Sequence, residues 1–177
     1  MSKVGNVVAI FPLPRKDRRK TDYALRGHLD ASQIESLDGL LRRRLGGNAL
    51  SALACQANHL LVLADNGKAD AIEGKEFPLL SALRDVLSVT ADYSGVIQSI
   101  EKGSGKFRVS LVLLGGHTAE QQMHASNRLT RVEGLSSPGL YTGSSTLAFD
   151  VSGNPKSRMK ALLDGLLKVG IAATVMP

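Results

Sequence analysis

The sequence is poor in the residues that would indicate a specific chemistry. Tryptophan is absent and aromatic residues are 4% of the 177 residues, so a core must be built from aliphatic side chains. The single cysteine, Cys55, excludes a disulfide within the chain, and four scattered histidines give no basis for a structural zinc site. No apolar run approaches the ~20 residues of a membrane-spanning helix. We therefore predict no metal, no cofactor and no membrane partner.

Catalytic motifs are absent as well. The stretch "EKGSGK", residues 101–106, is similar to a phosphate-binding loop, but Ile100 and Phe107 occupy positions where that motif requires glycine and a hydroxyl residue. His117 and His124 have no metal-ligand spacing with acidic residues. No segment brings a nucleophile, a base and an orienting residue together. We predict that the protein is not an enzyme.

Positive charge is the clearest excess in the composition. The chain has 22 Lys and Arg against 16 Asp and Glu, a formal charge of +6, which favours a polyanionic partner, with nucleic acid as the first candidate. The run "RKDRRK", residues 15–20, is equally consistent with a solvated linker and with a phosphate-binding arm. It follows the apolar stretch at residues 7–11, the reverse of a secretory signal, so we expect a product of the cytoplasm.

Three segments have the helical spacing of apolar residues: 32–47, 77–88 and 155–169. Ser32 and Glu35 form a capping-box pattern at the start of the first segment. Asn154 is placed to cap the third segment, Pro155 suits its first position, and Gly170 provides the stop. We predict three helices, with a distorted strand and loop as the alternative for residues 77–88, which closely follow a hairpin.

Strand patterns fill much of the remaining chain. Asn66-Gly67 stands between two strand-like runs and is a strong hairpin signal, and residues 96–116 form a second hairpin about a Gly-Ser-Gly turn. Residues 145–151 alternate as a further strand. The polar stretch at residues 117–139 is predicted to be a long exposed loop with a short element inside.

The last helix carries an apolar stripe that must be covered. Its members are Met159, Leu162, Leu163, Leu166 and Leu167. A helix of ~15 residues is ~22 Å long, too small to cover a sheet of five or six strands. We therefore predict a symmetric dimer in which each helix lies across both sheets. Gly165 fits close backbone packing at that contact, or is simply tolerated.

The order of elements, the Asn66-Gly67 hairpin, the stretch "GKFRVSLVLL" and the terminal "KALLDGLLKVG" resemble the coat proteins of single-stranded RNA bacteriophages of the levivirus type, over residues 58–177. The resemblance implies an α+β fold, an antiparallel sheet of hairpins with the C-terminal helix packed across a dimer partner. It also implies a homodimer that assembles into an icosahedral shell, a virion made in a bacterial host, and genomic single-stranded RNA on the inner sheet face. Residues 1–57 would be a separate basic arm and amphipathic helix.

With that architecture, strand alternation predicts the RNA-binding face. Phe107 and its alternating apolar neighbours would face the helices, while Arg108 and Ser110 would face RNA. The predicted RNA contacts are Lys102, Lys106, Arg108, Ser110, Thr142, Ser144 and Thr146. An ordinary solvated sheet face explains the hydroxyl residues equally well.

Two alternatives remain open. A small dimeric regulatory module of the roadblock type fits residues 32–114, with a helix, a hairpin and a second helix in that order. A stand-alone RNA-binding regulator would bind RNA as a dimer without forming shells. Particle size and nucleic-acid content separate the three readings.

Overall fold

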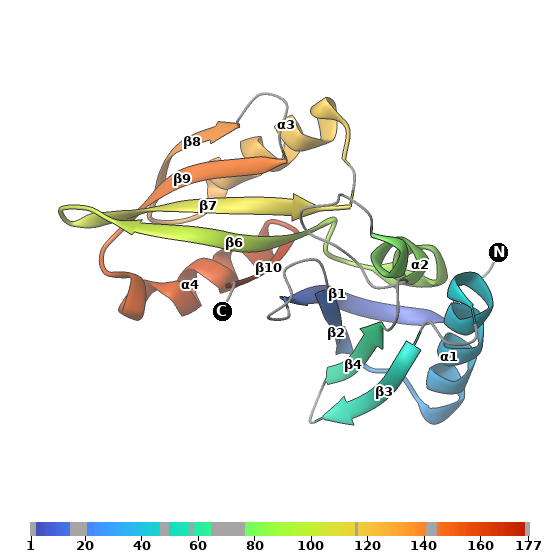
Figure 1. The fold of residues 1–177 in the computed structure, drawn as a ribbon. Coiled ribbons are helices and arrows are strands. Elements are labelled where there is room, and N and C mark those ends of the chain that lie inside the picture. Colours follow the sequence, from blue (N-terminus) through green and yellow to red (C-terminus); the bar gives the residue numbers. More distant parts are fainter. Residues whose placement is uncertain are drawn as a thin grey trace. The chain divides into compact units, whose positions relative to one another are not determined.

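The computed structural model describes residues 3–14, 21–46, 50–56, 59–64, 77–115, 117–140 and 145–175 (Figure 1). The chain divides into two compact units, Met1–Thr90 and Ala91–Pro177. Each unit contains a five-stranded sheet and two α-helices in its described ranges, so the α+β class is confirmed. The boundary predicted after residue 57 falls between two strands that pair with each other, whereas the structure divides after Thr90.

The first unit begins with two strands and alternates hairpins with helices. Its elements are β1 (Gly5–Pro14), β2 (Thr21–Gly27), α1 (Ala31–Leu45), β3 (Leu50–Gln56), β4 (His59–Ala64), α2 (Pro78–Val86) and β5 (Leu87–Val89). The strand order is β3-β4-β2-β1-β5. All neighbours are antiparallel except β1 and β5, which are parallel.

The second unit has the same kinds of element. They are β6 (Tyr93–Lys102), β7 (Lys106–Leu114), α3 (Ala119–Arg128), the 3-10 helix η1 (Leu129–Arg131), β8 (Leu135–Leu140), β9 (Thr146–Ser152), α4 (Pro155–Lys168) and β10 (Ile171–Val175). The strand order is β10-β6-β7-β9-β8, with β10 parallel to β6 and the other neighbours antiparallel.

The two units are topological repeats. Each runs strand, strand, helix, strand, strand, helix, strand, and in each the last strand lies parallel to the first at the sheet edge. The repeat extends to local detail at the first helix. Asp30 and Thr118 cap α1 and α3, and each forms a capping box with a glutamine three residues later. A glycine with positive φ precedes each cap by three residues, Gly27 and Gly115. This duplication was not among the features predicted from the sequence.

The predicted helices are present, with one change in their signals. The capping box of α1 is formed by Asp30 and Gln33, two residues before the predicted pair Ser32 and Glu35. The segment 77–88 forms α2 and then turns into the short strand β5. At α4 the structure has the predicted cap, Asn154, with Pro155 in the first turn.

The polar stretch at residues 117–139 is more ordered than predicted, because it holds α3, η1 and most of β8. Ala125 is the one buried residue in α3, so this helix lacks the apolar stripe on which a periodicity argument depends. The hairpin about residues 103–105 is present as β6 and β7, and the strand at 145–151 as β9. The Asn66-Gly67 turn lies outside the described residues.

Two helices cover one face of the second sheet. Ala125 of α3 and Leu162 and Leu166 of α4 belong to one core cluster with the buried strand residues Phe107 and Phe149. The predicted dimer rested on a single helix that could not cover the sheet, but α3 supplies additional cover within the same unit. Gly165 has its close neighbour in this unit too, since a Cβ there would lie 3.1 Å from Val132 Cγ1.

The topology also bears on the roadblock-type reading of residues 32–114. That reading places the hairpin of β6 and β7 in one domain with α1 and α2. In the structure β6 and β7 pair with β10 and β9, in a different sheet from β3 and β4. The segment 32–114 therefore contributes strands to two different sheets, and the roadblock-type reading stays a prediction.

Candidate nucleic-acid interface

Strand β7 presents the alternation that the sequence predicts. Phe107, Val109, Leu111 and Leu113 are buried in the core cluster beneath the helices. Arg108 and Ser110 are half-buried and point to the other face. Thr146 lies in the neighbouring strand β9, opposite Val112. Arg108, Ser110 and Thr146 therefore share the face that was predicted for them.

Arg108 is held by a carboxylate that the sequence analysis did not include. Its Nη1 donates to Asp150 Oδ1 at 3.1 Å, and Lys106 Nζ donates to Asp150 Oδ2 at 3.5 Å. The Asp150 side chain is 12% exposed, whereas those of Arg108 and Lys106 are 40% and 60% exposed. Partial burial raises the pKa of Asp150, but the hydrogen bonds and charges of Arg108 and Lys106 outweigh it and hold the pKa below its ordinary value.

These charges form part of a polar row across the sheet. Glu101 of β6, Arg108 of β7, Asp150 of β9 and Ser136 of β8 are consecutive Cα partners. The positive charge of Arg108 is thus partly compensated in place. Thr142 and Ser144, the other predicted hydroxyl contacts, lie outside the described residues, as does the basic run at 15–20.

A second set of cations lies beside the β6–β7 turn. The N–H of Gly153 donates to the carbonyl of Gly105 at 2.9 Å, and Ser152 is the Cα partner of Lys106, so the start of α4 adjoins the hairpin tip. We use the name hairpin-tip surface for the six cations that border this tip on both sides of the sheet: Lys106 and Arg108, which pair with Asp150 on the face away from the helices, and Lys102, Lys156, Arg158 and Lys160. Within residues 101–108 and 150–160 only Glu101 and Asp150 are acidic, which leaves +4 of the chain's +6 here.

Helix stability does not explain Lys156, because the helix dipole disfavours a positive charge at the N-terminus of α4. The first turn of α4 contains no acidic residue, and Lys156 adds a positive charge at the positive end of the helix, where its own N–H donates to the capping Asn154 Oδ1 at 3.0 Å. From the sequence, this segment was interpreted only as the start of a helix, so its cations were not among the predicted RNA contacts. The sequence spacing alone does not reveal that they lie next to the hairpin tip.

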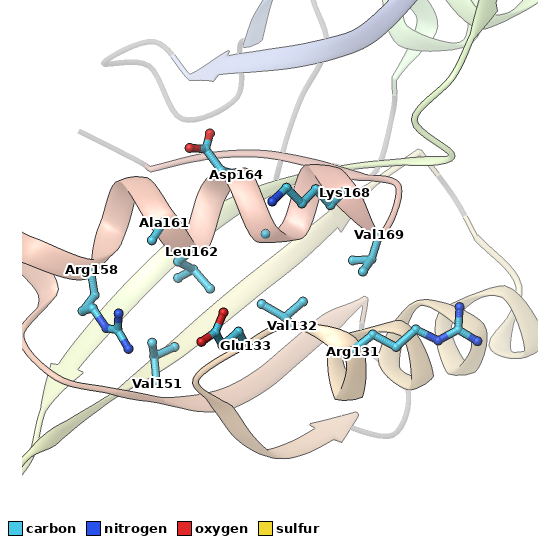
Figure 2. A pocket seen from close by; sticks show the side chains of 11 residues that line it. Arg131, Val132, Glu133, Val151, Arg158, Ala161, Leu162, Asp164, Lys168 and Val169 are labelled. Atoms are coloured by element: carbon cyan, nitrogen blue, oxygen red, sulfur yellow. The ribbon is translucent and has the colours of Figure 1, made fainter.

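Arg158 also borders a groove along α4 (Figure 2). The groove has a volume of about 480 Å³. The residues that line it are Arg131, Val132, Glu133, Val151, Arg158, Ala161, Leu162, Asp164, Gly165, Lys168 and Val169, and we call it the α4 groove. Its lining combines apolar side chains with two acidic and three basic residues.

The residues predicted to form a dimer interface divide into two groups. Leu162 and Leu166 are buried in the core of their own unit. Met159, Leu163 and Leu167 are partly buried, and the first two pack against that core. A partner's contact with α4 would therefore fall on the partly buried group, and the dimer itself stays a prediction.

Two features are absent from the parts of the chain that the structure describes. No group of three or more His, Cys, Asp or Glu side chains in those ranges is arranged to hold a metal ion. Each helix in the same ranges is too short or too polar to span a lipid bilayer.

Comparison with known proteins gives little further information. No family model matches the sequence, and no curated protein matches it. One solved structure, aspartokinase III of E. coli in complex with aspartate and ADP in its R-state, is 15% identical with a TM-score of 0.27. The match covers 89% of this chain and 32% of that chain. Similarity at this level supports no inference about fold or function.

Proposed function

We propose that this protein is a non-enzymatic RNA-binding protein and that the hairpin-tip surface contacts the phosphates. One observation carries the proposal: six cations and two carboxylates occupy two short segments that a main-chain hydrogen bond joins. RNA phosphates are recognised largely by Lys and Arg side chains, and six of these side chains are present here. Ser110 and Thr146 supply hydroxyl groups on the sheet face beside Arg108.

Asp150 refines this proposal. Its carboxylate already accepts hydrogen bonds from Arg108 and Lys106, so these two cations are less available to phosphate than the sequence suggested. Lys102, Lys156 and Lys160 have exposed side chains and lie outside that ion-paired cluster. We expect them to contribute most of the salt-dependent affinity.

The salt dependence of binding tests the proposal. Lys156→Ala should weaken the binding of single-stranded RNA and lower the slope of log affinity against log salt concentration by ~0.7, the value for one lost phosphate contact. Fluorescence anisotropy with a labelled oligonucleotide at several salt concentrations measures both. Arg43→Ala is the matched control, because Arg43 is an exposed cation of α1 in the other unit. Equal slopes for wild type and Lys156→Ala would reject the surface.

The more specific form of the proposal is a coat protein. In this form the chain dimerises, with α4 in contact with the partner, assembles into an icosahedral shell and encloses genomic RNA in a virion made in a bacterial cytoplasm. The residues of "GKFRVSLVLL" and of the last helix support it, as does the polar sheet face that carries Arg108. A stand-alone RNA-binding regulator would use the same surface without forming a shell.

A further inference from the structure

The α4 groove combines charges of both signs with an apolar floor. Val132, Val151 and Leu162 form the floor, and Figure 2 shows the Glu133 side chain among these three residues, with Arg158 toward one end. None of the five charged groove residues forms an ion pair within the described part of the chain. In the same unit, Asp92 and Asp150 have arginine partners at 2.6 and 3.1 Å. The groove charges are therefore free to meet a ligand that carries both hydrogen-bond donors and a negative group.

Arg158 is held in place by main chain. Its Nε donates to the carbonyl of Ser152 at 3.2 Å. A Cβ at Gly153 would lie 2.9 Å from Arg158 Cγ, and one at Gly134 would lie 3.4 Å from Nη2. Both glycines have positive φ, so the local backbone favours residues without a side chain there. The guanidinium consequently has a defined position at the mouth of the groove, where it can form two parallel hydrogen bonds to an anion.

We propose, on the basis of the proposed RNA-binding function, that the α4 groove holds one unpaired nucleotide and prefers a base with an exocyclic amino group. Arg158, which belongs to both the hairpin-tip surface and the groove, would contact the phosphate. The aliphatic floor would contact the flat face of the base or the ribose. The Glu133 carboxylate only accepts hydrogen bonds, so it suits the amino group of cytosine or adenine and repels the O4 carbonyl of uracil.

The dimensions agree with this occupant. A volume of about 480 Å³ lies within the range of ~300–1,000 Å³ found for small-molecule sites. In Figure 2 Asp164 points away from the floor and Arg131 extends beyond the far end of the groove, so Glu133 is the carboxylate closest to the floor residues. Recognition of single-stranded RNA commonly uses bases that are turned out of the stack into such pockets.

Cytidine monophosphate and uridine monophosphate provide a matched pair of probes, because they differ only at positions 3 and 4 of the base, and at position 4 cytosine has an amino donor where uracil has a carbonyl acceptor. We expect the full chain to bind the cytidine nucleotide about tenfold more tightly, the effect of one hydrogen bond to a charged acceptor. Isothermal titration calorimetry measures both affinities. Glu133→Gln should bring the ratio close to one, because an amide can donate to O4 as well as accept from the amino group.

Arg43→Ala is the control, since Arg43 is an exposed cation of α1 in the other unit and does not line the groove. It should leave the cytidine-to-uridine ratio unchanged. Equal affinities for the two nucleotides in the wild type, or a ratio that Glu133→Gln does not alter, would overturn the inference.

Short oligocytidylate and oligouridylate of equal length separate this inference from the proposed function. If both bind equally and with strong salt dependence, the RNA-binding function holds and the groove inference is wrong. If the cytidine nucleotide binds selectively but Lys156→Ala leaves the salt dependence of oligonucleotide binding unchanged, the groove inference holds and the hairpin-tip surface is wrong.

Discussion

At the scale of single residues, Asp150 changes the interpretation of the sheet face that carries Arg108. The face predicted from the sequence contains only cations and hydroxyl groups, which could all bind phosphate. With Asp150 between Arg108 and Lys106, phosphate must compete with a carboxylate that is already hydrogen-bonded. Such a surface binds polyanions less strongly than its count of cations suggests, because part of each charge interaction is already satisfied.

The pH dependence of stability reports on Asp150. Its pKa in the folded protein lies below the ordinary value of 3.8, so the ionised form stabilises the fold above that pH. The contribution is lost as the pH falls through the folded-state pKa. We expect Asp150→Asn to lower the Tm at neutral pH, and the difference from wild type to shrink as the pH falls below 3.8. Thermal denaturation followed by circular dichroism measures this.

Asp38→Asn is a suitable control for this experiment. Asp38 pairs with Arg42 one turn along α1, and both side chains are about a third or more exposed. Exposed pairs of this kind contribute ~0.5 kcal/mol or less. A Tm difference for Asp150→Asn that stays constant from neutral to acidic pH would contradict the role assigned to its charge.

From the sequence, alternation along a strand predicts which face each site residue occupies, but it does not predict its partner on the next strand. Period-two alternation along β7 correctly places Arg108 and Ser110 on the face away from the helices. The same alternation, continued from Thr146, would have placed Asp150 there too. That Asp150 faces Arg108 directly depends on the register between β7 and β9, which no local pattern specifies.

At the scale of elements, α4 has one deeply buried side and one partly buried side. Leu166 is 0% exposed in the core cluster, whereas Leu167 is partly buried and outside that cluster. Leu166→Ala should therefore lower the free energy of unfolding by ~2–5 kcal/mol whether or not a partner binds. Leu167→Asp should change it little but should dissociate the proposed dimer. Urea denaturation and sedimentation equilibrium measure the two effects.

The two variants serve as controls for each other. Wild-type stability in Leu166→Ala would contradict the packing of α4 on its own sheet. An intact dimer in Leu167→Asp would show that the dimer, if formed, does not use this side of α4.

Elements were predictable where their signals are local. Asn154, Pro155 and Gly170 define α4 within a few residues, so that helix was predicted correctly. Helix α3 lacks an apolar stripe, and its capping box of Thr118 and Gln121 was the sole local signal. The five residues of β10 were not predicted, because the strand is short and its pairing with β6 joins distant parts of the unit.

At the scale of the whole molecule, the coat-protein form of the proposal has a direct test. Negative-stain electron microscopy of the purified protein should show closed shells, and the particles should have the ultraviolet absorbance of nucleic acid. Dimers that bind RNA without forming particles would support the stand-alone regulator instead. Protein that is free of both particles and RNA affinity would reject both forms.

The topological duplication of the two units was not predicted, because few residues are identical at equivalent positions of the two units. When the two units are aligned at the first residues of α1 and α3, a few positions carry the same residue in both. They include Gly27 and Gly115, Gln33 and Gln121, and the buried pair Leu41 and Leu129. These residues serve turns, caps and core contacts, which many folds need. The shared strand order is therefore apparent from the pairing of distant strands and not from sequence identity.

The parallel pairing of first and last strands in each unit has a consequence for synthesis on the ribosome. The sheet of the first unit lacks its edge strand β5 until Leu87–Val89 has emerged, and the sheet of the second unit waits in the same way for Ile171–Val175. Each unit must therefore be translated almost to its end before its architecture is complete. The first unit can nevertheless reach its final strand order while the second is still being made, so the nascent chain has only one incomplete sheet at a time.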